Sequence, residues 1–397
     1  MISAREPRRV VVTGVGVVGP CGIGSEAFWK GLFGDQRTGP LHVEDFDPAQ
    51  WFENPKEARR ADRFTQFAMA AAEMAVEAAG GLSADSFRRG VHIGTGCGGI
   101  ETLETQIRTF FEKGPKRVSP FLVPMMMPNS AAAAVSMRFC CRGPCHTVTT
   151  ACATGTDSIA AGAAMVSEGR CDVVLAGSTE AALTPVSIQG FTNMTALSSD
   201  GLTHPFSVGR DGFVMAEGAA VVVLEELSHA LERGARPMAE ILGWASTADA
   251  HHITAPSPGG EGAATCMKLA LEHAGIAPAD VAQINAHGTG TPLNDAAEAS
   301  AIVSVFGDET PPVTSTKGVH GHALGAAGAL EATAVVLSIV NRRIPPTKGV
   351  TEYDPELPKL DLVTEAEGRQ WEPGVAISNS FAFGGHNACL VFGPPPS

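Results

Sequence analysis

Three residues of the chain have the side-chain types of a covalent catalyst: Cys152, His287 and His322. Cys152 lies between an apolar run and a run of small residues, where we expect a strand to lead into a helix. A thiol at a helix N-terminus is close to free backbone N–H groups and to the positive end of the helix dipole, and both favour its nucleophilic thiolate. His287 and His322 each lie in a glycine-rich turn. One thiol and two imidazoles on turns therefore predict covalent acyl chemistry.

A purely structural role is the alternative for each of these residues. Free cysteine is among the most buried residue types, and the chain has nine cysteines. Histidine is also often partly buried, with a structural hydrogen bond. The position of Cys152 before a helix, together with two histidines in similar turns, favours catalysis. Histidines without such a context are predicted to be structural, among them His146, His251, His252 and His320.

The composition describes a large acidic protein that can build a substantial core. Its 397 residues are 44% hydrophobic, and the formal net charge is −14, from 28 basic and 42 acidic residues. Such a charge argues against a protein that binds nucleic acid or a membrane surface. No CxxC pair occurs, and Cys141, Cys145 and His146 lack a second pair of zinc ligands, so we expect no metal. We find no signal peptide and no apolar span of 18 residues, and we expect a cytoplasmic protein with free thiols.

Strands and helices alternate along most of the chain. Such alternation predicts a largely parallel sheet that is covered by helices on both faces. We expect strands at 10–12, 91–96, 146–151, 172–177, 218–225, 238–243, 281–286 and 313–316, and a β-hairpin at 374–392. Helices are expected at 62–79, 153–168, 262–274, 293–306 and 323–341. A glycine-rich turn feeds an apolar strand late in each half, which suggests a duplication with halves at 1–236 and 237–397.

The glycines at residues 14–19 (GVGVVG) match the pattern of a dinucleotide-binding loop. That pattern needs a helix to follow it, because the helix N-terminus binds the pyrophosphate. Pro20, Gly22 and Gly24 would break such a helix. We therefore expect a tight turn at these glycines and no dinucleotide site.

Six motifs, taken together, resemble the β-ketoacyl-acyl-carrier-protein synthases of the elongating type, which have two catalytic histidines. The motifs are TACATG at 150–155, RDGF at 210–213, NAHGT at 285–289, STK at 315–317, GHALGAAG at 321–328 and NSFAFGG at 379–385. The resemblance covers nearly the whole chain in order. It implies an α/β protein with the thiolase fold, in which two duplicated α/β halves form a five-layered αβαβα arrangement.

The resemblance also implies an activity and a role for each matching residue. Cys152 would accept an acyl chain from acyl-carrier-protein, and malonyl-acyl-carrier-protein would then lose CO2 and condense with that chain. Two neutral imidazoles, His287 and His322, would stabilise the enolate, and the backbone N–H groups of Cys152 and Phe383 would form a second oxyanion hole. A buried Lys317 would hold His322 neutral and fix its hydrogen-bond partner, and the resemblance places Glu331 in the network of Lys317. Asp295 is a further supporting candidate, for which capping of a helix start is the alternative. Phe383 would gate the acyl pocket, next to substrate or gating positions at Phe381, Gly384, Thr289 and Thr291.

The implied partners are acyl-carrier-protein and a second subunit, either an identical copy or a chain-length-factor-like paralogue. No cofactor is expected beyond the phosphopantetheine that carries the substrates. Docking of an acidic carrier protein requires cations. Candidates for this role form two groups, although charged runs are often only solvated faces: Lys56, Arg59, Arg60, Arg63, Lys116 and Arg117.

At three positions the chain departs from the family pattern. Ala382 lies where glycine is usual, which could restrict the motion of the gating loop, because glycine permits backbone angles that alanine resists. Gly318 takes the place of a frequent serine, and His386 takes the place of a frequent threonine.

Several related functions remain as alternatives. A ketosynthase subunit of a type II polyketide synthase has the same motifs, and the sequence does not separate it from a fatty-acid enzyme. A thiolase would use a second cysteine, and Cys389 lies in strand-like sequence instead. Coenzyme A-primed synthases use cysteine, histidine and asparagine, whereas the third position here is His322. A non-catalytic chain-length factor would lack the nucleophile.

Overall fold

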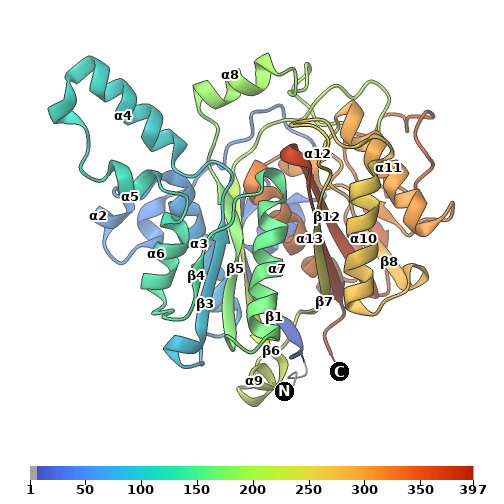
Figure 1. The fold of residues 1–397 in the computed structure, drawn as a ribbon, viewed down its shortest axis with the longest axis horizontal. Coiled ribbons are helices and arrows are strands. Elements are labelled where there is room, and N and C mark those ends of the chain that lie inside the picture. Colours follow the sequence, from blue (N-terminus) through green and yellow to red (C-terminus); the bar gives the residue numbers. More distant parts are fainter. Residues whose placement is uncertain (1–6, 397) are drawn as a thin grey trace.

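The computed structural model describes residues 7–396, and its main sheet runs through two α/β halves of similar topology (Figure 1). The strand order is β4-β3-β5-β6-β1-β7-β13-β12-β8-β9, and β2 pairs with β1. The strands of the first half are β1 (Val10–Gly19), β2 (Gly22–Ile23), β3 (Arg89–Gly94), β4 (Cys145–His146), β5 (Val173–Glu180) and β6 (Gly218–Glu226). Those of the second half are β7 (Ala239–Ala248), β8 (Val281–Asn285), β9 (Val313–Thr314), β12 (Val375–Ala382) and β13 (His386–Gly393). A separate small sheet pairs β10 (Arg343–Ile344) with β11 (Arg369–Gln370).

Each half connects its strands in the same order. From the shared boundary outward, β1-β6-β5-β3-β4 in the first half corresponds to β7-β13-β12-β8-β9 in the second. The helices are α1 (Ser25–Gly31), α2 (Pro55–Ala58), α3 (Arg63–Ala78), α4 (Ile100–Lys113), α5 (Leu122–Met126), α6 (Ser130–Arg138), α7 (Thr154–Ser167), α8 (Pro185–Asn193), α9 (Leu227–Glu232), α10 (Glu261–Ala274), α11 (Pro292–Phe306), α12 (Lys317–His320) and α13 (Ala327–Asn341). Counterparts also match in position, with α3 and α10 early and α7 and α13 before the last two strands of each half.

Five layers result from the way these helices pack. The outer helices α3 and α10 cover β1 with β6 and β7 with β13, respectively. The inner helices α7 and α13 contact each other and strands of both halves. Small residues make this close approach possible, because a Cβ at Gly155 of α7 would lie 2.3 Å from the backbone nitrogen of Ala329 on α13. The expected thiolase fold is confirmed.

The sheet is mixed, and the prediction of a largely parallel sheet was wrong. Parallel pairing is limited to β3 with β4 and β5, and to β8 with β9 and β12. The ladders β5–β6, β6–β1, β1–β7, β7–β13 and β13–β12 are antiparallel. In each half the chain reverses its direction between the last two strands, whereas a crossover connection would have made them parallel. The predicted hairpin at 374–392 is present as β12 and β13.

Two local predictions were also wrong. Residues 14–19 form no turn, because they continue β1, and their glycines let α3 pack closely on the strand. A Cβ at Gly16 would lie 1.9 Å from the carbonyl oxygen of Ala71. The strand expected at 146–151 is reduced to the two residues of β4, and residues 147–150 form no strand.

One segment is apolar and long enough to cross a membrane, although we expected none. This segment, Leu324–Asn341, has a mean hydropathy of 1.6. It includes α13, and 89% of it is buried inside the protein, between the two halves. A helix that is hydrophobic on all sides is suited to such an interior layer. The apolar composition of this segment is therefore explained by its burial between the two halves.

Candidate active site

Cys152 lies in a short 3₁₀ turn, Ala151–Ala153, that leads directly into α7. The side chain of Thr154 stabilises this turn, because its hydroxyl donates to the carbonyl of Ala151 (2.7 Å) and accepts from the backbone N–H of Thr150 (2.9 Å). Ala151 has φ +49°, a left-handed conformation that costs a non-glycine residue about 1 kcal/mol. The predicted position of the thiol at a helix N-terminus is thus found, with a strained residue immediately before it.

The thiol is more deeply buried than its position suggested. Burial raises the pKa of Cys152 to about 12, while the charge of Lys317 and a hydrogen bond from the backbone N–H of Phe383 act in the opposite direction. The expectation of a lowered pKa was therefore wrong for the resting site, because the loss of solvation outweighs the favourable contacts. The sulfur needs a neighbouring base to lose its proton.

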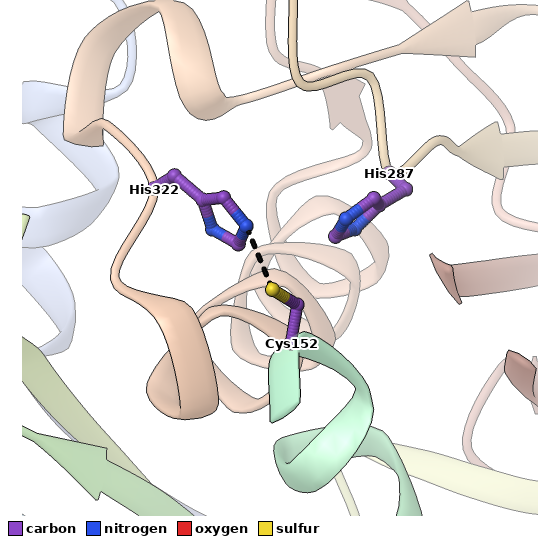
Figure 2. A group of neighbouring side chains, drawn as sticks. All are labelled: Cys152, His287 and His322. Carbon is purple, nitrogen blue, oxygen red and sulfur yellow. Dashed lines mark hydrogen bonds between the residues drawn. The ribbon is translucent and has the colours of Figure 1, made fainter. Parts of the chain in front are cut away.

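His322 is that neighbour. Its Nε2 lies 3.1 Å from the sulfur of Cys152 (Figure 2). Backbone bonds fix the residue, since its N–H donates to Val214 (2.7 Å) and its carbonyl accepts from Ala216 (3.0 Å). The ring packs edge-on against Phe213, with 4.9 Å between ring centroids. Burial and the charge of Lys317 hold the pKa of His322 well below its usual value, so the resting imidazole is neutral.

His287 lies across the same space, with its ring centroid 5.3 Å from that of His322. Its Nδ1 is 3.2 Å from the Nζ of Lys317, which also donates to the carbonyl of His287 (2.6 Å). An ammonium group can only donate hydrogen bonds, so Nδ1 accepts and Nε2 carries the proton. Burial, followed by the charge of Lys317, lowers the pKa of His287 well below its usual value. His287 is therefore a neutral ring with a fixed N–H donor.

Lys317 and Glu331 form a completely buried ion pair. Lys317 begins α12, and Glu331 lies on α13. Burial raises the pKa of Glu331 to about 7, and Lys317 acts against that rise. The contact between the two residues is the one that the resemblance implied. Lys317 nevertheless bonds to His287, whereas we expected it to fix His322.

Two carboxylates shape the turn that carries His287. Asp295 on α11 is completely buried, and it accepts from the backbone N–H groups of Phe206 (2.8 Å) and Gly290 (3.2 Å). Glu298, one turn further along α11, accepts from the backbone N–H groups of His287 (2.8 Å) and Gly288 (2.7 Å). Glu298 was not predicted from the sequence. Its spacing of three residues from Asp295, which places both on one helix face, was the available signal.

The three central residues could also suggest a metal site. The potential ligand atoms of Cys152, His287 and His322 all lie within 4.8 Å of one another, and theirs is the single grouping of this kind found within residues 7–396. Histidine that binds a metal usually donates its other ring N–H to an acceptor. The other ring nitrogen of His287 faces the ammonium group of Lys317 instead. The donor set therefore fits proton transfer and oxyanion binding rather than metal ligation.

A cavity of about 340 Å³ opens onto the sulfur. The residues predicted for substrate binding or gating contribute to its lining, namely Thr289, Thr291, Phe381 and Phe383. The hydroxyls of Thr289 and Thr291 lie 2.9 Å apart. Gly384 is exposed and has φ +83°, which favours glycine.

The departures at 382 and 318 have structural explanations. Ala382 is extended (φ −121°, ψ 159°), and the left-handed angles of this loop fall on Gly384 and Gly385. Alanine is therefore compatible with the conformation seen here. Gly318 is required, because a Cβ there would lie 2.0 Å from the carbonyl oxygen of Lys348.

The candidate docking cations are not equivalent. Arg63 forms a bidentate ion pair with the buried Glu217, with Nε–Oε2 and Nη2–Oε1 distances of 3.0 and 2.6 Å. Its charge is thus already paired with an internal carboxylate, and its side chain is only partly exposed. The other five are exposed, and the ion pairs among residues 7–396 include none of them: Lys56, Arg59, Arg60, Lys116 and Arg117. Arg60 lies over the ring of Phe121, 4.6 Å from its centroid.

Comparison with known proteins agrees with this geometry. Residues 34–230 match the Beta-ketoacyl synthase N-terminal domain, and residues 238–351 match the corresponding C-terminal domain. The chain is 42% identical to 3-oxoacyl-[acyl-carrier-protein] synthase 2 of Synechocystis, covering 98% of each chain. It is 43% identical to the enzyme of that name from Staphylococcus aureus strain N315, covering 97% of this chain and 98% of the relative. The solved structure of the ishigamide ketosynthase/chain length factor superposes with a TM-score of 0.92 at 35% identity, covering 98% of this chain and 100% of that one. The chain therefore belongs to the β-ketoacyl synthase family.

Proposed function

We propose that this enzyme elongates acyl chains in fatty-acid synthesis by decarboxylative condensation, giving 3-oxoacyl-acyl-carrier-protein and CO2. The observation that carries the proposal is the contact between the sulfur of Cys152 and Nε2 of His322 (3.1 Å), with the fixed donor of His287 opposite. The names of the two relatives, both at least 42% identical, support the same reaction.

The first half of the reaction loads an acyl chain onto Cys152. The proton of the thiol moves to Nε2 of His322, and the sulfur attacks the carbonyl carbon of the acyl thioester. The backbone N–H of Phe383 lowers the pKa of Cys152, and this influence on the sulfur supports a donor role toward the oxyanion. The bond from the acyl carbon to the carrier sulfur then breaks. Because the pKa of His322 is low, the ring passes its proton on to the departing thiolate.

The second half forms the carbon–carbon bond. A malonyl thioester binds with its carbonyl oxygen near the two imidazoles, and cleavage of its bond to the carboxylate releases CO2 and leaves an enolate. The Nε2–H of neutral His287 donates to that charge in a water-poor site. The enolate carbon attacks the thioester on Cys152, the bond to Cys152 breaks, and the released thiolate takes up a proton from water. This chemistry needs no cofactor beyond the phosphopantetheine of the carrier.

The test uses the purified protein with acyl-carrier-proteins of increasing chain length, together with malonyl-acyl-carrier-protein. We expect a product two carbons longer that has a 3-oxo group, an equal amount of CO2, and a transient acyl adduct on Cys152 by mass spectrometry. An adduct on another residue, or product without any adduct, would contradict the covalent mechanism.

A ketosynthase of a type II polyketide pathway is the second candidate. The similarity to a solved type II PKS ketosynthase in complex with its acyl-carrier protein, at 33% identity and a TM-score of 0.89, favours it. The same assay separates the two, because a polyketide enzyme would extend its product repeatedly without reduction of the 3-oxo group. An activity that requires an added paralogue would point in the same direction.

The proposed carrier-docking surface consists of Lys56, Arg59, Arg60, Lys116 and Arg117. Electrostatic complementarity to an acidic carrier supports this assignment. We expect the double variant Lys116→Glu, Arg117→Glu to raise KM for acyl-carrier-protein about tenfold, with little change in kcat. Steady-state kinetics at two salt concentrations measures this, and the difference from wild type should shrink at high salt. Lys268→Glu, an exposed site on α10, is the matched control, and an equal effect there would contradict a local surface.

The subunit arrangement is also a proposal. No residue of α4 is buried, and exposed apolar side chains gather on α4 and on the segment that follows it, namely Ile107, Phe110, Phe111, Phe121 and Val123. Figure 1 shows α4 projecting away from the sheet. Such an apolar surface supports a homodimer, or a heterodimer with a paralogue. We also propose that the boundary between the two halves lies between residues 236 and 237. The proposed location of the enzyme is the cytoplasm.

A further inference from the structure

Glu180 is a completely buried carboxylate that the proposed reaction does not use. It is the last residue of β5, and its two oxygens accept four hydrogen bonds. Oε1 accepts from the hydroxyl of Thr95 (3.1 Å) and the backbone N–H of Cys97 (3.2 Å). Oε2 accepts from the backbone N–H groups of Gly96 (2.8 Å) and Gly325 (3.1 Å). No cation pairs with Glu180 among residues 7–396, so these four hydrogen bonds replace the water that would otherwise solvate the carboxylate.

The donors belong to two turns that reach the active site from opposite sides. Gly325 follows His322 by three residues, in the turn where Leu324 has φ +46°. A leucine rarely adopts such a left-handed angle, because its Cβ then crowds the following carbonyl oxygen. The other turn follows β3, and the carbonyl of Thr95 accepts from the hydroxyl of Thr149 (2.8 Å), three residues before Cys152. Glu180 is therefore bonded directly to the His322 turn and, through Thr95, to the segment that carries Cys152.

The two turns meet without intervening side chains. A Cβ at Gly325 would lie 2.3 Å from the backbone nitrogen of Gly96, and a Cβ at Gly96 would lie 2.5 Å from Oε2 of Glu180. Contacts this short exclude any larger residue at either position. The separation of the two turns is thus set by backbone contact and by the carboxylate that bonds to both.

The charge of Glu180 opposes activation of the nucleophile. After burial, which is the larger cause, the negative charge of Glu180 contributes to the raised pKa of Cys152. A residue that activated the thiol would act in the opposite direction. Positioning and activation therefore give opposite expectations for the reactivity of the thiol when Glu180 is neutralised.

We propose that Glu180 is a positioning residue for the condensation, which bonds the turn after β3 to the turn after His322 and so fixes His322 beside Cys152. This inference rests on the proposed function. Three of the four partners of Glu180 are backbone N–H groups, which only donate, and the hydroxyl of Thr95 is the one partner able to accept from an amide. A glutamine would therefore direct its N–H groups at one or two backbone N–H groups, and the link between the two turns would be weakened.

The experiment compares Glu180→Gln with wild type by two measurements. We expect kcat for condensation to fall about tenfold, while KM for malonyl-acyl-carrier-protein stays near the wild-type value. We also expect Cys152 to react faster with iodoacetamide, with its pH profile of alkylation shifted to lower pH, because a negative charge has been removed. A general loss of structure would not shift the profile in that direction.

The matched control is Glu225→Gln. Glu225 is equally buried, on β6, but it is paired with Arg233 and lies outside the active site. We expect this variant to have a lower melting temperature with unchanged kcat and alkylation profile. If Glu180→Gln does not fold, Thr95→Val removes one of the four donors, and we expect it to lower kcat about threefold, with Thr95→Ser near wild type.

The outcomes distinguish this inference from the proposed function. If the wild type condenses and Glu180→Gln has the same kcat, the positioning role alone is overturned. The same holds for Thr95→Val if Glu180→Gln does not fold. A parallel decrease of condensation and alkylation would also overturn it. Absence of condensation in the wild type would overturn the proposed function and the inference with it.

Discussion

Replacing Cys152 by alanine is expected to lower the rate of condensation by at least about 10³-fold and to abolish the acyl adduct. Decarboxylation of malonyl-acyl-carrier-protein should persist, because His287 and His322 keep their positions and neither depends on the sulfur for its backbone contacts. The two reactions are measured separately, by product mass and by CO2 release.

The control for this variant is Cys97→Ala, which removes a thiol that lies closer to solvent. Its backbone N–H, which bonds to Glu180, is retained. We expect near-wild-type condensation and a normal adduct. Condensation by Cys152→Ala at more than a few per cent of the wild-type rate would contradict its assignment as nucleophile.

Replacing His287 by alanine is expected to reduce decarboxylation and condensation by about 10²–10³-fold, which is the usual effect of losing one oxyanion donor. Self-acylation should be much less affected, since His322 is the ring in contact with the sulfur. Rapid quenching followed by intact-mass measurement gives the acylation rate, and CO2 release gives the decarboxylation rate.

Comparison with His322→Ala makes this test sharper. Because Nε2 of His322 contacts both the thiol and the shared cavity, we expect that variant to lose acylation as well as condensation. His92→Ala is the buried control, on β3 and outside the cavity lining. Equal effects of His287→Ala on acylation and decarboxylation would contradict the division between the two rings.

The residues of the site could be predicted from the sequence because their motifs are local. Cys152, His287 and His322 line one cavity and Lys317 contacts His287, and each of the four lies in a short pattern that is recognisable without its partners. The layered fold was likewise expected from the resemblance. Strand direction was not, because alternation of helices and strands does not show where a hairpin replaces a crossover.

Properties that depend on distant partners could not be predicted in this way. The pKa of Cys152 is set by its depth of burial, which the helix start does not reveal. Arg63 was taken for a surface cation because its partner, Glu217, is 154 residues away. Glu180 carries no local signal at all, as its four donors come from the turn after β3 and from Gly325.

The nucleophile lies in the first half of the molecule and both histidines lie in the second, so catalysis depends on how the two halves are placed. The contact between sulfur and imidazole joins residues that are 170 positions apart, across the helical layer formed by α7 and α13. A shift of about an ångström between the two halves would leave the hydrogen bonds within each half in place and still remove proton transfer. Catalysis thus requires a more exact relative position of the two halves than folding does. The interior helices α7 and α13 set the distance between the sulfur and the imidazole.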